Sequence, residues 1–289
     1  MSSRCAKLTR QSLRADARLG DVESQFQLAC SYDFERPKDR RRAVHWYEKA
    51  AAQGHAEAQN LLGESYRDGV GVQRSPETAV HWFKLAAAQG EPDAQLSLGH
   101  RYFYGEGVRR DQTEALRWYR RAARNDSEGA MCNIASMYRC GDVVKQSWTM
   151  AIRWYRKAAE AGNVAAMHWL GRIYGGYEEY PEHKDEAFYW LKEASKAGDM
   201  QSQTALGVCY FNGWGVRRNR KHAAKNYRLG AEQGDTWAQY LLGLCYRDGD
   251  GVKRNSRWAL YWFDHAAVDT PEAQKAAKAL RGIKNGSKT

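Results

Sequence analysis

The sequence predicts an all-α protein, a right-handed α–α superhelical solenoid of about seven two-helix repeats with a period of 36 residues. Three observations predict this fold. An aromatic pair recurs every 36 residues, a Leu-Gly-x-x-Tyr pattern recurs in phase with it, and a Gly-x-Gly-Val turn follows that pattern in four repeats. Three motifs with one period indicate units that bury their apolar faces against their neighbours.

The aromatic pair marks the second helix of each repeat. The seven pairs are Trp46-Tyr47, Trp82-Phe83, Trp118-Tyr119, Trp154-Tyr155, Trp190-Leu191, Asn226-Tyr227 and Trp262-Phe263. The Leu-Gly-x-x-Tyr pattern marks the first helix, with Ile-Ala in place of Leu-Gly in one repeat. Its tyrosines are Tyr66, Tyr102, Tyr138, Tyr174, Tyr210 and Tyr246. Equivalent residues of neighbouring repeats are therefore expected to stack.

Residues 56–71 illustrate the first helix and its end. Ala58, Leu62 and Tyr66 recur every four residues, which is the spacing of one helix face. The glycines of the turn that follows favour left-handed backbone conformations and end the helix. The first helix of each repeat therefore has a predicted core face and a predicted end.

The second helix begins at residues 75–77, Ser-Pro-Glu, where serine caps the helix and proline occupies its first turn. A second apolar stripe follows and includes Trp82 and Phe83. Small residues in both helices allow the backbones to approach closely, and large residues fill the remaining space. We expect both aromatic residues and the repeat tyrosines, Tyr138 among them, to lie in the core.

The repeats divide the chain into a seven-unit solenoid, residues 21–270, and two ends. We interpret residues 1–20 as a degenerate capping helix, and residues 271–289 as a basic capping helix with a frayed tail. The first unit is two residues short and has 35–38 in place of the glycine turn. The fifth unit lacks the turn, and its acidic, aromatic segment 175–185 is either an irregular turn or an insertion that binds a partner.

The combined pattern Ala-x-x-x-Leu-Gly-x-x-Tyr, Gly-x-Gly-Val and Ala-x-x-Trp-Tyr-x-x-Ala-Ala-x-x-Gly resembles the Sel-one-like repeat (SLR) family. The resemblance covers about seven units, roughly from Asp21 to Thr270. This family is related to the tetratricopeptide repeat. The resemblance implies a helical solenoid that acts as a scaffold or adaptor and binds other proteins along a curved surface.

The cysteines do not follow the pattern of the secreted, cysteine-rich branch of that family, which carries a disulfide in each unit. Cys132 and Cys140 have the spacing of eight, but both fall within one predicted first helix. Two helical turns separate their Cα atoms by about 12 Å, beyond the reach of a disulfide. We therefore expect reduced thiols.

The charge of the chain first suggests a nucleic-acid partner, because 45 basic and 34 acidic residues give a formal net charge of +11. Most of this excess lies at the two ends, however, and the seven-unit body has 35 basic and 32 acidic residues. No apolar run approaches the ~20 residues of a membrane-spanning helix. The start has no apolar segment typical of a secretory signal, so we predict a cytoplasmic protein.

No catalytic or metal-binding motif is visible. The Gly-x-Gly segments at 105–107 and 213–215 lack the third glycine and the preceding strand of a phosphate-binding loop. His45 and His81 occupy equivalent slots without a carboxylate or cysteine fixed between them. We therefore predict no enzyme activity, no metal site and no cofactor.

The resemblance implies that the first helices line the concave groove of the solenoid. The groove slots that carry polar and aromatic residues are typical of binding hot spots, although Phe103 and Phe211 could instead pack against neighbouring helices. The predicted partner-binding residues are Asn60, Glu64, Arg67, His100, Phe103, Arg139, His168, Arg172, Phe211, Trp237, Tyr240 and Arg247. Five tryptophans outside the repeat slot are secondary candidates: Trp148, Trp169, Trp214, Trp237 and Trp258.

Basic residues also follow the glycine turns and would form a ladder along one edge of the stack. This basic edge comprises Arg74, Arg109, Arg110, Arg217, Arg218, Lys253 and Arg254. It is either a solvated edge or a surface for an acidic partner.

Three hypotheses follow. The leading one is a non-enzymatic scaffold or adaptor that binds a protein or peptide in the groove, for example as a regulatory or toxin-immunity partner. The first alternative is nucleic-acid or acidic-partner binding through the basic edge, which predicts a steep dependence on salt. The second is a hydrolase of cell-wall-like substrates, for which no nucleophile–base pair is visible. No membrane partner is expected, and the oligomeric state is not predicted.

Overall fold

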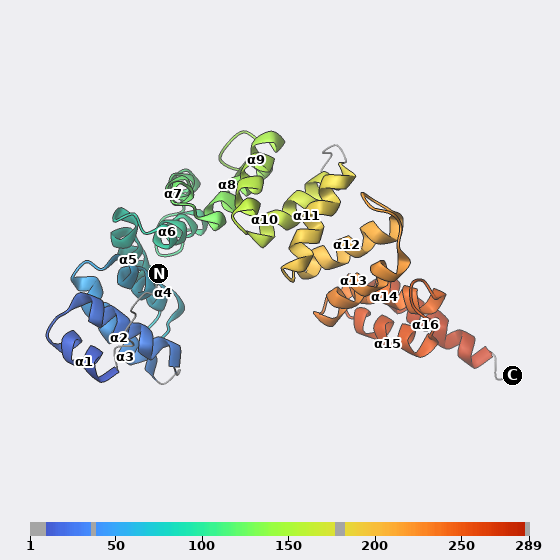
Figure 1. The fold of residues 1–289 in the computed structure, drawn as a ribbon, viewed down its shortest axis with the longest axis horizontal. Coiled ribbons are helices and arrows are strands. Elements are labelled where there is room, and N and C mark those ends of the chain that lie inside the picture. The colour runs from blue at the N-terminus through green and yellow to red at the C-terminus, as the bar shows by residue number, and fades with distance from the viewer. Residues whose placement is uncertain (1–9, 36–38, 177–182, 287–289) are drawn as a thin grey trace, which may run out of the picture. The chain divides into compact units, whose positions relative to one another are not determined.

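The computed structural model describes residues 10–35, 39–176 and 183–286, and over these residues it contains sixteen α-helices and no strand (Figure 1). The chain divides into two compact units, unit 1 (Met1–Ala151) and unit 2 (Ile152–Thr289). No helix among the described residues is long and apolar enough to cross a membrane.

The helices of unit 1 are α1 (Arg10–Arg18), α2 (Val22–Glu35), α3 (Arg40–Ala52), α4 (Ala56–Asp68), α5 (Pro76–Ala88), α6 (Pro92–Tyr104), α7 (Gln112–Arg124) and α8 (Glu128–Cys140). Helix α9 (Trp148–Glu160) contains the boundary between the units. The helices of unit 2 are α10 (Val164–Tyr174), α11 (Lys184–Lys196), α12 (Met200–Asn212), α13 (Arg220–Glu232), α14 (Thr236–Asp248), α15 (Ser256–Ala266) and α16 (Pro271–Gly286).

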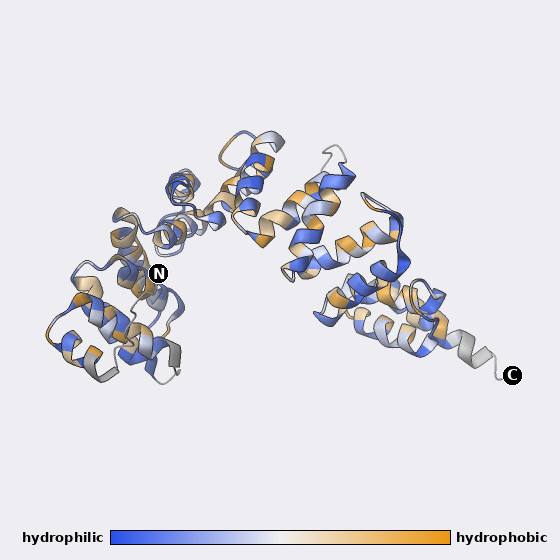
Figure 2. Ribbon diagram, in the orientation of Figure 1, coloured by the Kyte–Doolittle hydropathy of each residue, from blue (hydrophilic) through white to orange (hydrophobic). Residues whose placement is uncertain are grey.

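Each unit is a stack of helix pairs. In unit 1, α4 packs against α5 and α3, and α6 packs against α7 and α5. In unit 2, α12 packs against α13 and α11, and α14 packs against α15 and α13. Individual helices carry both apolar and polar residues (Figure 2), as expected of amphipathic helices that bury one face. The prediction of an all-α solenoid of two-helix repeats is confirmed.

The terminal helices lie against the repeats next to them. Leu13 and Ala17 of α1 are buried, and α1 packs on α2. Ala273 and Ala277 of α16 are buried, and α16 packs on α15. Helix α16 continues to Gly286, so part of the tail for which we expected fraying is helical. The predicted turn at 36–38 and most of the segment 175–185 lie outside the described residues.

In four repeats the core contains an aromatic ring packed on a glycine of the first helix, at Gly63, Gly99, Gly207 and Gly243. Phe83 of α5 is fully buried, and a Cβ atom on Gly63 of α4 would lie 2.7 Å from its Cε1 atom. The Leu-Gly motif therefore contains glycine because the ring occupies the space of a side chain. Trp82, which we expected in the core as well, is only partly buried.

Five of the six repeat tyrosines, all except Tyr174, are less buried than expected, and hydroxyl groups among them reach charged residues of the preceding second helix. Tyr66 and Glu48 are 3.2 Å apart at their oxygens, and Arg228 donates to the hydroxyl of Tyr246 at 2.6 Å. Tyr138 is partly buried, and its neighbour Met137 lies in the core instead. The expectation that Tyr138 is a core residue was wrong.

A pair of glutamines, the buried Gln59 and the exposed Gln89, joins the two helices of a repeat and was not predicted from the sequence. Nε2 of Gln59 donates to the carbonyl oxygen of Ala51 at 3.0 Å, and Nε2 of Gln89 donates to Oε1 of Gln59 at 2.8 Å. Equivalent amide pairs are Gln25 with Gln53, Gln95 with Asn125, and Gln203 with Gln233. In the fourth and fifth repeats the same positions hold Met131 with Ala161, and Met167 with Ala197. A polar pair is thus replaced by an apolar pair.

The second glycine of the turn allows a close approach between repeats. Gly107 has a φ of 71°, and a Cβ atom there would lie 2.2 Å from the carbonyl oxygen of Pro76, at the start of α5. A side chain at this position would therefore push neighbouring repeats apart. The turn that follows α6 is thereby fixed against the preceding second helix.

Candidate functional site

The predicted groove residues lie on the first helices, α4, α6 and α8 in unit 1 and α10, α12 and α14 in unit 2. We call the surface that these residues form the first-helix face, and it is described separately for each unit. The residues of this face occupy equivalent positions in each first helix, next to the core residues. The residue types at these positions differ from one repeat to the next.

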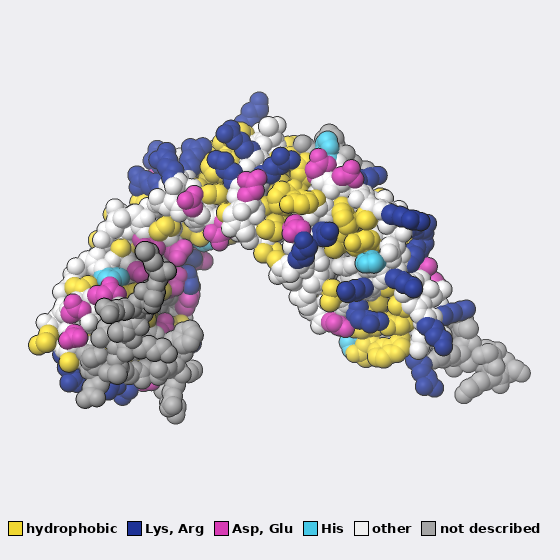
Figure 3. Space-filling model, in the orientation of Figure 1, with side chains coloured by type: hydrophobic (Ala, Val, Ile, Leu, Met, Phe, Trp, Pro, Cys, Tyr) yellow, Lys and Arg dark blue, Asp and Glu magenta, His cyan; other side chains and the backbone are white. Residues whose placement is uncertain are grey.

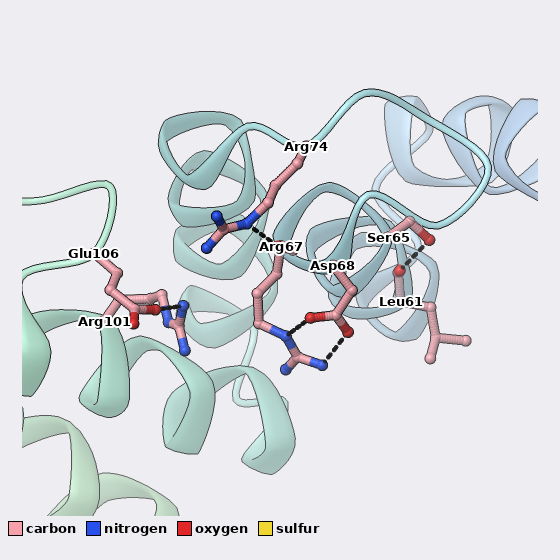
Figure 4. A network of polar contacts seen from close by, with 7 residues as sticks. All are labelled: Leu61, Ser65, Arg67, Asp68, Arg74, Arg101 and Glu106. Atoms are coloured by element: carbon pink, nitrogen blue, oxygen red, sulfur yellow. Dashed lines mark hydrogen bonds and ion pairs between the residues drawn. The ribbon is translucent and has the colours of Figure 1, made fainter.

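On α4, the predicted residues range from buried to half-exposed. Asn60 is 4% exposed, and its Oδ1 atom has no hydrogen-bond partner. Burial raises the pKa of the Glu64 carboxyl, although Arg67 opposes this shift. The Nε and Nη2 atoms of Arg67 donate to the two carboxylate oxygens of Asp68 at 2.8 and 2.6 Å (Figure 4). The guanidinium of Arg67 therefore has an acidic partner within the chain.

On α6, the guanidinium of Arg101 pairs with Glu106 of the following turn (Figure 4). The neighbouring His100 lies 2.9 Å from Asn133 of α8, measured from Nε2 to Nδ2. Burial lowers the pKa of His100, so its imidazole is held in the neutral form. His100, Phe103 and the half-buried slot residue Ser136 line a cavity of about 210 Å³. Arg139, at the end of α8, is half-buried.

On α10, His168 is 8% exposed and belongs to a closed polar cluster. Its Nδ1 atom lies 2.8 Å from Oγ of Ser202 and 3.2 Å from Oδ2 of Asp199. Burial opposes ionisation of Asp199, but the hydrogen bonds from His168 and Ser202 prevail and lower its pKa to about 2. Ser202 is fully buried and contacts the same imidazole nitrogen as Asp199, so these residues lack the arrangement of a Ser-His-Asp triad, in which serine and aspartate contact opposite ring nitrogens.

A cavity of about 640 Å³ on this face lies in unit 2. The predicted residues His168 and Arg172 of α10 line it, together with Thr204 of α12, which occupies the slot equivalent to Asn60. Trp237 of α14, which is 48% exposed, and Trp214 of the turn after α12, which is 42% exposed, also contribute to its walls. The structure thus brings several predicted residues of α10, α12 and α14 around one cavity.

A neighbouring cavity of about 360 Å³ lies between α12 and α14 and shares Trp237 with the larger one. Phe211 lines it, and the guanidinium of Arg220 stacks on the Phe211 ring at 3.8 Å from its centroid. Tyr240 packs between Trp237 and Phe263, with ring centroids 5.3 and 6.0 Å away. Tyr240 therefore supports Trp237 from the core side.

The last predicted residue of the face, Arg247, is exposed and binds both carboxylate oxygens of Asp248 at 2.8 Å. Arg67 binds Asp68 in the same way, so in both cases the arginine pairs with the aspartate that directly follows it in the sequence. Both arginines thus have an internal carboxylate partner.

All seven residues of the basic edge are exposed. In one turn, however, the basic side chain folds back onto the helix before it. Nε of Arg74 donates to the carbonyl oxygen of Arg67 at 3.0 Å (Figure 4). Nε2 of Gln146, in the equivalent position, donates to the carbonyl oxygen of Arg139 at 3.0 Å. These side chains cap helix C-termini, which favours positive charge at this position for structural reasons.

The described residues contain no group of three or more His, Cys, Asp and Glu side chains placed to hold a metal ion. Five cysteines are described, Cys30, Cys132, Cys140, Cys209 and Cys245, and all are free thiols. Cys132 and Cys140 lie on α8, as the spacing predicted.

Two contributors to the large cavity were not identified from the sequence, Lys184 at the start of α11 and Leu191 on the same helix. The signal for Leu191 was present, because it replaces the ring of an aromatic pair. Lys184 carries no such signal, since it precedes the repeat motif.

A family model described as the Sel1 repeat matches seven segments of the chain, residues 22–55, 56–91, 92–127, 129–163, 164–199, 201–235 and 238–267. No curated protein matches the sequence. Crystal structures of other repeat proteins are similar to this chain. One is c5321, a protective antigen of uropathogenic Escherichia coli strains with an SLR fold, at 31% identity over 94% of this chain with a TM-score of 0.87. The chain spans 59% of the length of that protein.

The second is a Sel1 repeat protein from Oxalobacter formigenes, which is 27% identical over 85% of this chain and 96% of its own, with a TM-score of 0.71. An immunity protein from Pseudomonas aeruginosa, PA5088, is 21% identical over 74% of this chain and 82% of its own, with a TM-score of 0.46.

Proposed function

The chain belongs to the Sel1 repeat family, generally a non-enzymatic protein-interaction fold, and on this premise we propose that it is a scaffold or adaptor that binds a protein or peptide along its first-helix face. One observation carries the proposal: the core slots repeat and the face slots do not. The slot that closes the first helix holds, in successive repeats, Arg67, Phe103, Arg139, Gly175, Phe211 and Arg247. A position that the core does not constrain is available for contacts with a partner.

The cavities support the same surface. Three of them, of about 210, 360 and 640 Å³, are lined by residues of the first helices. Aromatic and arginine side chains such as Phe103, Trp237 and Arg172 lie at their walls, and these residue types carry most of the binding energy in protein interfaces. Cavities beside such residues offer positions for partner side chains.

The test compares two variants that each lose three positive charges. The first changes Arg67, Arg139 and Arg247 of the first-helix face to alanine, and the second changes Arg109, Arg217 and Lys253 of the basic edge. Partners captured by each tagged protein are quantified by mass spectrometry, and helix content is checked by circular dichroism. We expect the face variant to lose its partner and the edge variant to retain it.

The opposite result, with loss in the edge variant alone, would support nucleic-acid or acidic-partner binding at the basic edge and contradict the proposal. A salt titration of the captured complex separates these cases further, because a phosphate-dominated interaction weakens steeply with salt.

The proposal includes a cytoplasmic location, supported by the free thiols of the five described cysteines. A narrower role in neutralising a toxin has no support from PA5088, because its similarity is limited to 21% identity and a TM-score of 0.46. The proposed function is therefore binding of a protein or peptide partner, without a narrower role.

A further inference from the structure

The 640 Å³ cavity of unit 2 lies where one repeat departs from the others. Leu191 occupies the position of the buried ring and packs on Gly171, as Phe83 packs on Gly63. Gly175, at the end of α10, occupies the slot in which other repeats carry arginine or phenylalanine. Two large side chains are thus missing from one place. Such departures from the local rules are expected at functional sites.

The floor and walls of this cavity are largely apolar. Leu191, Ala205 and Val208 contribute to its surface, and Trp214 and Trp237 are exposed beside them. Its volume lies within the range of roughly 300–1,000 Å³ that is typical of ligand pockets. An apolar side chain of a partner that entered the cavity would be removed from water on several sides. This arrangement favours an aromatic or branched aliphatic anchor.

The charged groups of the described lining are mainly basic. Arg172 lies with its guanidinium 5.1 Å from the ring centroid of Trp169, and the Lys184 amine lies 5.8 Å from that of Trp214. The one acidic residue of the lining, Asp235, caps α14 by accepting from the backbone N–H groups of Trp237 and Ala238, and it also accepts from Oγ1 of Thr204 at 2.5 Å. Its carboxylate therefore accepts hydrogen bonds from within the chain, and Arg172 and Lys184 place two positive charges in the lining.

The surroundings carry the same charge. Unit 2 has 22 basic and 15 acidic residues in the sequence, acidic residues of the segment 177–182 included. On the side of unit 2 seen in Figure 3, hydrophobic side chains over α12 to α14 lie between groups of Lys and Arg side chains. A partner segment with negative charge beside its anchor is complementary to this surface.

We infer that this cavity is an anchor site for an acidic segment of a partner protein, in which an aromatic or branched aliphatic side chain inserts between Trp214 and Trp237 while flanking carboxylates lie against Arg172 and Lys184. The inference rests on the proposed function and deepens it by stating the chemistry of the partner.

The test is a selection of peptides from a random dodecapeptide display library on the full chain. The enriched consensus peptide is then synthesised with a fluorescent label, and its affinity is measured by anisotropy at low and high salt. We expect a consensus with one aromatic or branched aliphatic residue flanked by Asp and Glu. Its affinity should fall several-fold on going from low to high salt.

Four variants locate the bound peptide. Trp214→Ala with Trp237→Ala should weaken binding at least tenfold, and Arg172→Gln should weaken it several-fold and flatten the salt dependence. Leu191→Phe restores the ring that other repeats carry and should fill the cavity, so it should weaken binding at least tenfold without loss of helix content. Arg153→Gln, which removes one charge from an exposed position of α9 outside the cavity lining, should leave the affinity unchanged.

A consensus with basic or uncharged residues beside the anchor, or binding that survives both Leu191→Phe and the tryptophan pair, overturns the inference. The proposed function fails separately, since it requires that replacement of Arg67, Arg139 and Arg247 releases the captured partner. If the triple arginine variant loses its partner but the peptide binds equally well to the cavity variants, the anchor site is rejected and the proposed function is not.

Discussion

The first-helix faces of unit 1 and unit 2 are built on one repeat and carry different chemistry. In unit 1 the cavity beside His100 is about 210 Å³, and Phe83 and Tyr119 are the rings that pack on the glycines of the first helices. In unit 2 a leucine and a glycine replace larger residues, and the cavity is about 640 Å³. The comparison teaches that this repeat opens a cavity by losing side chains from its core and edge, while the helices themselves remain.

The largest expected effect tests whether the same ring-on-glycine arrangement stabilises the cores of both units. Phe83→Ala in unit 1 and Phe263→Ala in unit 2 each remove a fully buried ring that packs on a glycine. We expect each to lower the free energy of unfolding by about 3–5 kcal/mol. Urea unfolding followed by circular dichroism measures the change. Costs that differ strongly between the two variants would show that the units do not share a core design.

The next effect tests the glutamine pair against its apolar replacement. Gln59→Met removes the donor to the buried carbonyl oxygen of Ala51 and should destabilise the protein by about 1–3 kcal/mol. The double variant Gln59→Met with Gln89→Ala copies the pair Met131 and Ala161, and it should cost little more than Gln59→Met alone, because the Gln89 side chain is exposed and donates to the Gln59 amide oxygen that the first substitution already removes. The same urea titration reports both values. A further loss of similar size in the double variant would contradict the exchange of polar for apolar pairs.

A smaller effect distinguishes the polar clusters behind the two faces. His168 of unit 2 has an acidic partner, Asp199, whereas His100 of unit 1 has the neutral Asn133. The pKa of Asp199 lies at about 2, below its ordinary value of 3.8, so its contribution is complete above that ordinary value and is lost as the pH falls towards 2.

We expect the wild-type protein to lose about 1 kcal/mol more than Asp199→Asn between pH 5 and pH 2, because the carboxylate is partly exposed and screened. Urea midpoints measured across this range give the comparison. Parallel pH profiles for the two proteins would contradict the assignment of this titration to Asp199.

The smallest expected effect concerns the exposed aromatic residues of unit 2. Trp214→Ala and Trp237→Ala should each change the free energy of unfolding by less than about 1 kcal/mol, because both side chains are 42–48% exposed. Thermal unfolding followed by circular dichroism checks this. A larger loss would identify the tryptophans as structural residues and weaken their assignment to binding.

Much of the fold could be predicted from the sequence, because the same pattern of apolar residues, glycines and helix caps recurs in seven repeats. The 36-residue period, the glycine ends of the first helices and the N-cap at Ser75 are local features, and each was predicted before any contact was known. The face slots were predicted from the resemblance, and the structure places His168, Arg172 and Trp237 around one cavity. The buried amide of Asn60 and the capping role of Arg74 were not predicted, since both depend on contacts beyond the motif.

By itself, the sequence determined the repeat, the order of the helices and the positions at which they end, because glycine conformation, helix caps and apolar spacing act within a few residues. Only the tertiary structure decided which of two adjacent aromatic residues enters the core, Phe83 and not Trp82, since that depends on the glycine of the facing helix. It also decided that Leu191 and Gly175 open a single cavity, because the two residues lie on different helices and meet only when those helices pack.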